Sequence, residues 1–545
     1  MNSEIRLLPV NSYELEQHLT DMGLSLLSFA SEINFSEKCV GVKNCDFIQA
    51  VIIELISEIK IDFIAYHAVY VARLAGVQKA VIIANEHGPE AIAEAAIHAQ
   101  QADIVTDNFN PDLLFKIRYN VNALKKNLVN AVYQQQVQRR QKRRQLDAIP
   151  KAAPGQFRVL MSTFHPGTVS TLTPVQDRLN ERSDVHQLYV ANRYETHDKL
   201  VKLGYKNVIS AWSIGQLEKY SMNTGILKSF VNDYFKLSFP FGDATSHFKS
   251  RFYQVLKRKL KFAISLFGPF EKILNNYNPN SIVVSSSSTI DAQLIVQLAA
   301  TRNTKTIEVT HGLFQETPIL KFQNIPIKLV WNQFQADLMK MFKENVECIL
   351  VGNPKHDQLL ERFKKNPPLN QFNRPYVLFA TTPGNNNNIS ATTYLKILTD
   401  FVFAAQKNSE MLFVIKLHPT ENIGKVIEEC TQMGFSENLV IEQSKDVYEL
   451  IYHASIVMVV TSTVGYEALL FNKRIITYTV ENSEKWLPFS KFNLAIGVDT
   501  SQGILDAIDE LKTNPSSVFS NDKKSYFVYS DGNAISKTID IILTK

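Results

Sequence analysis

The sequence has few cysteines and no long apolar segment, and both absences exclude protein classes. Its four cysteines among 545 residues form no CxxC pair, which argues against a disulfide framework or a zinc site and favours reduced thiols. No apolar run reaches about 18 residues without a charge, and the N-terminus lacks a basic region followed by an apolar one. We therefore expect neither a membrane-spanning helix nor a signal peptide, and predict a cytoplasmic protein.

Several catalytic signatures are also missing. The sequence contains no GxxxxGK(S/T) phosphate loop, no HExxH zinc motif and no GxSxG nucleophile turn, which argues against three large enzyme classes. It contains no DxD triplet, so a metal ion bridging a diphosphate is not predicted. The net charge of +5 and the pI near 8.7 are too weakly basic to predict nucleic-acid binding. They are compatible with an anionic small substrate or a loose membrane contact.

The composition that is present, 45% hydrophobic and 20% charged, is typical of globular proteins. Short apolar segments alternate with amphipathic helical ones, which indicates βα units and parallel sheets. We predict an α/β protein with a small domain at 1–128, a basic helical linker at 129–156, and two facing Rossmann-like domains at 157–340 and 341–545. The final helix, Asn533–Lys545, could pack on either of these two.

One polar turn follows the apolar segment Leu412–Ile415, which we predict to be a strand. Lys416 and His418 stand directly after it, and Pro419 fixes the turn. In open α/β sheets ligands bind at the carboxyl ends of the strands, so both side chains are candidates for binding phosphate. A histidine at such a position is a structural residue as often as it is a ligand contact.

A second polar turn follows the predicted strand Ile456–Val460. Ser462 or Thr463 can cap the helix that begins there, and the free N–H groups of a helix start bind anions. The helix dipole contributes only about 0.3–1 kcal/mol, so we expect a nearby cation or donor to help. Glu467, one turn further on, is suited to accept two ribose hydroxyls. Together the two turns predict a pocket for a nucleotide mono- or diphosphate.

The first Rossmann-like domain offers a candidate base, His311, after the predicted strand Lys305–Thr310. With an ordinary pKa of about 6.5 it could take a proton from an acceptor hydroxyl; a histidine bonded to a backbone carbonyl is equally compatible with this turn. Other strand-end residues could line the same cleft or simply cap turns and helices: His165, Gly167, Ser286, Gly352, Asn353 and Thr382.

Four of these stretches together resemble the glycosyltransferases of the GT-B fold: THG (310–312), GNPKHD (352–357), KLHP (416–419) and TSTVGYEALLFNK (461–473). More narrowly, they resemble the branch that holds the teichoic-acid glycerophosphotransferases, the capsule polysaccharide transferases, and the bacterial sialyl- and Kdo-transferases. Those enzymes mostly use cytidine-nucleotide donors and need no metal.

The resemblance implies roles for individual residues. His418, Ser462 and Thr463 match the groups that bind the donor phosphate, and Glu467 matches the acidic residue that holds the ribose. His311 matches the histidine proposed as base in the glycerophosphotransferases. In the sialyl- and Kdo-transferases the base is usually a carboxylate of the first Rossmann domain, and no residue of this sequence is matched to it.

We therefore expect an inverting, metal-independent glycosyltransferase without a cofactor. It would move a sugar, such as a sialic-acid-like sugar or Kdo, from a CMP- or CDP-linked donor to a surface glycan or protein acceptor, in the cytoplasm or at the inner membrane face. HPTENIG (418–424) is also similar to the UDP-N-acetylglucosamine 2-epimerases, whose Gly-Gly turn is replaced here by Ser462-Thr463-Val464. A non-catalytic nucleotide-sugar-binding regulator is the third alternative.

The N-terminal domain has a resemblance of its own. Lys79–Leu124 resembles the second half of a response-regulator receiver domain. A phosphoacceptor aspartate would follow a strand at Ile61–Ala65, where Tyr66 and His67 stand instead, so we expect a degenerate receiver that docks a partner or a second copy. The basic cluster Arg139–Arg144 is interpreted as a solvated helix face, with contact to anionic lipid as the alternative.

Overall fold

The computed structural model describes residues 3–8, 13–75, 77–83, 89–102, 104–106, 148–163, 166–211, 214, 220–312, 316–383, 389–480, 483, 488–514 and 521–544. Several predictions lie outside these residues: the basic cluster 139–144 with most of its linker, the candidate residue His165, and residues 107–124 of the receiver-like stretch.

The first large domain is built on a seven-stranded parallel sheet in the order β10-β9-β8-β7-β4-β5-β6. Parallel strands buried on both faces consist of short, nearly continuous apolar runs, and these strands follow that pattern. They are β4 (Phe157–Thr163), β5 (Val185–Ala191), β6 (Val208–Ser210), β7 (Ser281–Val284), β8 (Lys305–Val309), β9 (Ile327–Val330) and β10 (Glu347–Leu350).

The second large domain is built on a six-stranded parallel sheet in the order β13-β12-β11-β14-β15-β16. Helices follow its strands along the chain, so each sheet is a Rossmann-like layer, and the predicted α/β fold class is confirmed. The strands are β11 (Tyr376–Ala380), β12 (Leu412–Lys416), β13 (Leu439–Glu442), β14 (Ile456–Val459), β15 (Arg474–Tyr478) and β16 (Ile496–Val498).

Helices cover both faces of each sheet. In the first domain α9 and α10 share a core with one face, and α6 and α19 pack on the other. In the second, α13, α14 and α17 cover one face, and α15, α16 and α18 the other. The helices of the two large domains are α6 (Val169–Asn180), α7 (Tyr194–Lys202), α8 (Thr224–Leu237), α9 (Ser246–Tyr277), α10 (Ile290–Ala300), α11 (Gln333–Phe342), α12 (Pro354–Lys365), α13 (Ala391–Lys407), α14 (Ile423–Gln432), α15 (Val447–His453), α16 (Val464–Leu470), α17 (Ser501–Thr513), α18 (Asn521–Phe527) and α19 (Ala534–Leu543).

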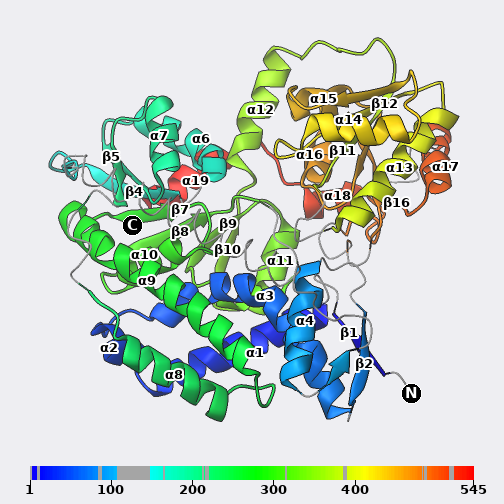
Figure 1. Cartoon of the computed structure of the whole chain (residues 1–545). Coiled ribbons are helices and arrows are strands. Elements are labelled where there is room, and N and C mark those ends of the chain that lie inside the picture. Colours follow the sequence, from blue (N-terminus) through cyan, green and yellow to red (C-terminus); the bar gives the residue numbers. More distant parts are fainter. Residues whose placement is uncertain are drawn as a thin grey trace.

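The chain crosses between the two large domains twice (Figure 1). Strand β10 lies within the predicted domain 341–545, but it forms the edge of the first sheet rather than part of the second. From there α12 leads into the second domain. After α18 the chain returns, and Ile539 and Ile542 of α19 join the core around Val159 in the first domain.

In its described residues, the N-terminal region combines a three-stranded parallel sheet with four helices. The predicted strand Ile61–Ala65 is wrong, because these residues lie in the middle of a 28-residue helix, α3. The receiver-like interpretation thus loses the strand that would precede its phosphoacceptor. The elements are β1 (Ser3–Arg6), α1 (Tyr13–Glu32), α2 (Phe35–Val40), α3 (Phe47–Leu74), β2 (Lys79–Ile83), α4 (Pro89–Gln101) and β3 (Val105–Thr106).

Helix α3 is apolar on nearly all sides, which is typical of a helix buried in a core. It packs against α1, α4, α9 and α10, and one hydrophobic core extends from it to Leu160 and Ile282 of the seven-stranded sheet. Asp46 begins the helix by accepting hydrogen bonds from the N–H groups of Ile48 and Gln49. Across the described residues, no helix combines the length and the apolar character needed to cross a membrane.

Candidate functional site

The two polar turns of the second domain lie at the same edge of its sheet. Strand β11 runs between β12 and β14, and the two threonines after it contact both turns. Thr381 Oγ1 accepts a hydrogen bond from the backbone N–H of His418 at 3.0 Å. Thr382 Oγ1 accepts one from Thr461 at 3.4 Å. The KLHP turn and the TSTVGYE turn are therefore separated by one strand, in the position where such sheets bind ligands.

His418 is exposed, and its ring is held from one side. Nδ1 accepts from the backbone N–H of Thr420 at 3.3 Å and lies 2.7 Å from the Thr420 hydroxyl. An accepting Nδ1 means that the neutral ring carries its proton on Nε2. No described residue bonds Nε2, so this N–H is available to a phosphate oxygen.

Glu421 stabilises the backbone of this turn, a role that the sequence motif did not predict. Its Oε2 accepts from the His418 N–H at 2.6 Å and from the Thr381 hydroxyl at 2.5 Å. Gln443 supports the other side by donating to the backbone oxygens of His418 and Glu421. The turn is thus fixed by side chains from three neighbouring strand ends.

Lys416 lies behind the turn. Its side chain is buried, with 8% of its surface exposed, and Nζ donates to the backbone oxygens of Leu417 at 3.2 Å and Gln443 at 2.7 Å. Burial lowers its pKa, although neighbouring carboxylates act in the opposite direction. Two of the three N–H donors of the ammonium are occupied, so Lys416 contributes positive charge at close range with one donor left.

Ser462 and Thr463 differ in what they do at the start of α16. The Ser462 hydroxyl accepts from the N–H of Val464 at 3.3 Å, so it is used as a cap. Thr463 occupies the cap position itself, but its exposed side chain makes no capping bond. The Thr463 hydroxyl is therefore the better placed of the two to meet a ligand.

Glu467 sits one turn into α16 and is half-buried. Its Oε1 accepts from the Tyr448 hydroxyl at 3.0 Å. Burial raises the pKa of the carboxyl to about 7, while the charge of Lys355 and the Tyr448 bond lower it. The Lys355 ammonium lies 4.8 Å from the centre of the Tyr448 ring. Tyr448, which no motif of the sequence indicated, thus positions the Glu467 carboxyl with its hydroxyl hydrogen bond.

His311 lies at the end of β8 in the first domain and is exposed. Its Nδ1 is 2.9 Å from the hydroxyl of Thr171 on α6. The turn is held by Trp331, whose Nε1 donates to the Thr310 oxygen, and by Gln335, whose amide donates to the Gly312 oxygen, both at 2.9 Å.

The other candidates from the first domain lie at adjacent strand ends. Ser286 follows β7, and its hydroxyl accepts from the N–H of Ser288 at 3.2 Å. Gly167 lies in the short helix η1 (Pro166–Thr168) after β4. Since β4, β7 and β8 are neighbours in the sheet, Gly167, Ser286 and His311 share one edge.

Gly352 and Asn353 serve to position helices. Gly352 has a φ of +86°, and a Cβ there would lie 3.0 Å from the Tyr529 backbone oxygen. Asn353 is buried and caps α12 by accepting from the Lys355 N–H at 3.0 Å. Asp357 accepts from the N–H of Ile535 at the start of α19. Within this motif it is Lys355 that extends toward Glu467.

Direct contacts join the two sheet edges. Asn332, which follows β9, donates to the Tyr466 hydroxyl on α16 and to the Phe527 backbone oxygen. The rings of Trp331 and Tyr466 lie 6.0 Å apart. Because Trp331 also holds the Thr310 turn, the THG turn and the TSTVGYE helix are linked through two side chains.

Asp291 is a further acidic residue of the first domain, at the start of α10 and 5% exposed. Asn192, which follows β5, donates to its carboxyl group. Burial raises the pKa of Asp291 to about 6, against the bonds from Thr289 and Asn192. The only indication of it in the sequence is its position as the last residue of the hydroxyl-rich stretch VVSSSSTID (283–291).

Comparison with known proteins gives one family match and several structural likenesses. Residues 381–480 match the family model described as capsule polysaccharide biosynthesis protein. This segment contains both polar turns of the second domain. A search of curated protein sequences found no match.

The similar solved structures are distant in sequence. The UDP-GlcNAc 2-epimerase from Neisseria meningitidis, bound to UDP-GlcNAc, is 14% identical over 71% of this chain and 100% of its own, with a TM-score of 0.47. The UDP-GlcNAc 2-epimerase from Methanocaldococcus jannaschii is 13% identical, covering 71% and 99%, with a TM-score of 0.46. The glycotransferase of kitacinnamycin is 10% identical, covering 72% and 95%, with a TM-score of 0.44.

Proposed function

We propose that this protein is a glycosyltransferase that uses a nucleotide-activated sugar and needs no metal ion for the transfer. The observation that carries the proposal is the shared sheet edge, where the Nε2–H of His418 and the hydroxyl of Thr463 lie on either side of β11, with the Glu467 carboxyl one turn behind. The match of residues 381–480 to the capsule polysaccharide biosynthesis model supports sugar chemistry for this same segment.

In this proposal the second domain binds the donor. His418 and Thr463 donate hydrogen bonds to the phosphate, and the buried ammonium of Lys416, bonded to the Leu417 oxygen next to His418, adds positive charge. The His418 ring and the Lys416 ammonium are held in position by hydrogen bonds before the reaction. They stabilise the negative charge that develops on the leaving nucleotide phosphate without further reorganisation. Glu467, when ionised, accepts the two ribose hydroxyls.

His311 is the proposed base. In the tautomer in which Nδ1 donates to the Thr171 hydroxyl, Nε2 is unprotonated and can take the proton of an acceptor hydroxyl. The oxygen of that hydroxyl then attacks the anomeric carbon from the side opposite the leaving phosphate, which inverts its configuration. Asp291 is the second candidate base, because its raised pKa of about 6 is suited to proton transfer near neutral pH.

We infer that the donor is CMP- or CDP-linked, carrying a sialic-acid-like sugar or Kdo, and that the acceptor is a surface glycan or protein. The resemblance of the four motifs supports a cytidine donor. We also propose that the enzyme acts in the cytoplasm, with a peripheral contact at the inner membrane face. Its N-terminal region would dock a partner or a second copy of the chain.

Thermal unfolding of the purified protein with CMP, CDP, UDP, GDP or ADP, with and without EDTA, tests the donor site. Each shift is measured against protein in the same buffer without nucleotide. We expect a cytidine nucleotide to raise the unfolding temperature and the shift to persist in EDTA, because ligand that binds only the folded state stabilises it. No shift with any nucleotide would contradict the donor-site proposal.

The HPTENIG motif favours a second function, a 2-epimerase acting on a UDP-linked sugar. An NMR assay of UDP-GlcNAc with the protein and no acceptor separates the two functions. Conversion to a second UDP-sugar would support the epimerase, whereas a transferase requires an acceptor for turnover. Nucleotide-sugar binding without turnover in either assay would favour the regulator.

A further inference from the structure

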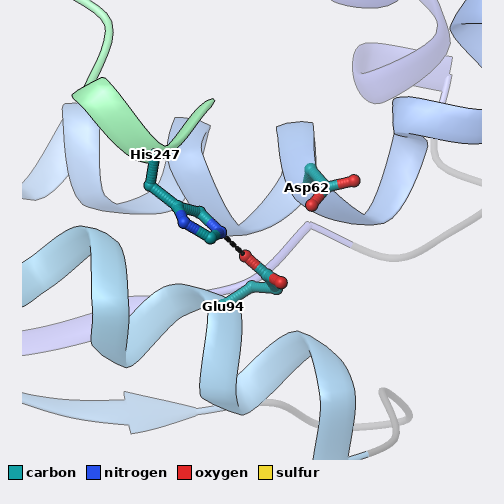
Figure 2. Close-up of side chains that lie close together, drawn as sticks. All are labelled: Asp62, Glu94 and His247. Carbon is teal, nitrogen blue, oxygen red and sulfur yellow. Dashed lines mark hydrogen bonds and ion pairs between the residues drawn. The ribbon is translucent and has the colours of Figure 1, made fainter. Parts of the chain in front are cut away.

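Three metal-ligating side chains gather at the junction of α3, α4 and α9, away from both sheet edges. They are Asp62, Glu94 and His247, and one ligand atom of each lies within 4.8 Å of the others. Figure 2 shows Glu94 between the histidine ring and Asp62. Asp62 is 4% and Glu94 2% exposed. Each side chain comes from a different helix, so the cluster depends on how these helices pack.

Each of the two buried carboxylates contacts a basic side chain. Arg251 Nε donates to Asp62 Oδ1 at 3.2 Å, and His247 Nε2 lies 2.6 Å from Glu94 Oε2. Arg251 is always charged, but His247 balances Glu94 only while it is protonated. Buried carboxylates are stable when they are paired or when they coordinate a metal.

His98 lies at the same junction. It is completely buried on α4, one turn after Glu94, so both side chains lie on one face of the helix. Its Nδ1 lies 2.7 Å from the Thr245 hydroxyl. Its Nε2 is buried without a hydrogen bond of normal geometry, although the Asp62 backbone is near enough to influence the ring. The ring centres of His98 and His247 are 5.3 Å apart.

We propose that Asp62, Glu94 and His247 bind one divalent first-row metal ion, of the Zn²⁺ or Mn²⁺ class, and that His98 packs beside this site without being a ligand. One imidazole nitrogen with two carboxylate oxygens is a donor set typical of these ions. At metal–ligand bonds of about 2.1 Å, tetrahedral ligand atoms lie about 3.4 Å apart, so the three side chains must close in by rotation. On binding, His247 Nε2 gives up its proton, and Arg251 remains bonded to Asp62 as an outer partner.

The site would fasten α3 and α4 of the N-terminal region to α9 of the first Rossmann-like domain. It does not touch the donor turns, so it is independent of the proposed metal-free transfer. The metal-site proposal and the transferase proposal can fail separately, because a Co²⁺ titration measures metal binding and does not depend on sugar transfer.

The test uses the full chain, freed of any affinity tag and dialysed against EDTA, then titrated with Co²⁺ while its visible absorption is recorded. We expect one equivalent to bind with the absorption bands of protein-bound Co²⁺, and Zn²⁺ to displace it. Glu94→Gln should weaken Co²⁺ binding by at least about 100-fold, since loss of an outer-shell partner alone typically costs 10–100-fold.

The matched control is Glu58→Gln, one turn before Asp62 on α3, where the carboxylate pairs with Arg258 and Lys259 instead. It should bind Co²⁺ like the wild type. His247→Gln, at the more exposed corner of the cluster, serves if Glu94→Gln does not fold. Failure of the wild type to take up one equivalent, or equal binding by the cluster variants, would overturn the proposal and leave an ion-pair network balanced by Arg251 and protonated His247.

Discussion

At the scale of single residues, His418 and His311 differ in what holds their rings. His418 Nδ1 accepts from its own turn, which leaves Nε2–H as a donor for a ligand. His311 Nδ1 lies 2.9 Å from the hydroxyl of Thr171 on α6, and that hydroxyl can accept a hydrogen bond from Nδ1–H. The same side chain is thereby suited to bind an anion in one domain and to accept a proton in the other.

We predict that His418→Ala weakens nucleotide binding while His311→Ala leaves it nearly unchanged. A hydrogen bond to a charged group contributes about 1.5–3 kcal/mol, so the dissociation constant should rise roughly 10- to 150-fold for the first variant. Isothermal titration with the stabilising nucleotide measures this. Equal affinity of wild type and His418→Ala would remove the phosphate role.

The matching kinetic prediction concerns the base. His311→Ala should lower kcat by roughly 10²- to 10⁴-fold, the usual contribution of a general base, with nucleotide affinity preserved. Asp291→Asn is the comparison, and the single-turnover rate with saturating donor is the measurement. A large loss in Asp291→Asn with a normal rate in His311→Ala would reassign the base to Asp291.

Glu467 predicts a pH effect on stability. Burial raises its pKa from 4.5 to about 7 in the folded protein, so the folded state retains this proton at pH values where the unfolded chain has lost it. The contribution of this group to the free energy of unfolding should therefore fall as the pH rises from about 4.5 to about 7, and then level off.

Denaturant unfolding of wild type and Glu467→Gln at pH 5 and pH 7.5 measures that contribution. The wild type should lose stability relative to the variant at the higher pH. An unchanged difference between the two proteins would mean that the Glu467 carboxyl titrates in the same way folded and unfolded.

At the scale of elements, the turn before α12 is set by backbone conformation. Gly352 adopts a φ of +86° with the Tyr529 carbonyl close by. Gly352→Ala should lower the free energy of unfolding by about 1–2 kcal/mol, the cost of a left-handed conformation for a residue with a Cβ.

Gly204 is the control for that substitution, because it also has a left-handed φ, of +90°, but an added Cβ there would have nothing within 4 Å. Gly204→Ala should lower the free energy of unfolding by no more than the left-handed cost of about 1–2 kcal/mol, and by less than Gly352→Ala, whose Cβ also meets the Tyr529 backbone oxygen. Urea unfolding compares the two variants. Equal effects would mean that the Gly352 turn relaxes around the methyl group.

Most strands could be predicted from the sequence because buried parallel strands are short apolar runs between polar turns. The same reasoning failed at Ile61–Ala65, since a short apolar run cannot be distinguished from part of a buried helix by periodicity alone. β10 lies within the predicted domain 341–545 yet pairs with β9 of the first sheet, because no local pattern assigns a strand to one of two sheets.

Some residues of the candidate site could likewise be predicted from the sequence, and others could not. His418, Thr463 and His311 could be named because they directly follow strands, and strand ends meet at one edge. Tyr448, the Asn192–Asp291 pair and the link through Asn332 to Tyr466 are contacts between distant segments. A single sequence carries no signal for them until the helices are packed.

At the scale of the whole molecule, the first domain is assembled from both ends of the chain. The N-terminal helices share a core with its sheet, and α19 packs on its opposite face. The second large domain lies between these segments in the sequence (Figure 1). The contacts of Asn332 with Tyr466 and Phe527 couple the two at the candidate site.

The double crossing has a consequence for how the protein can be cut. A protease that cleaves either connection, near Gly352 or between α18 and α19, leaves the two halves tethered by the other. A chain shortened before Ala534 would lose no part of the nucleotide-binding edge, yet it would strip the packing of Ile539 and Ile542 from the opposite lobe. Loss of the C-terminal helix should therefore unfold the first large domain before it affects the second.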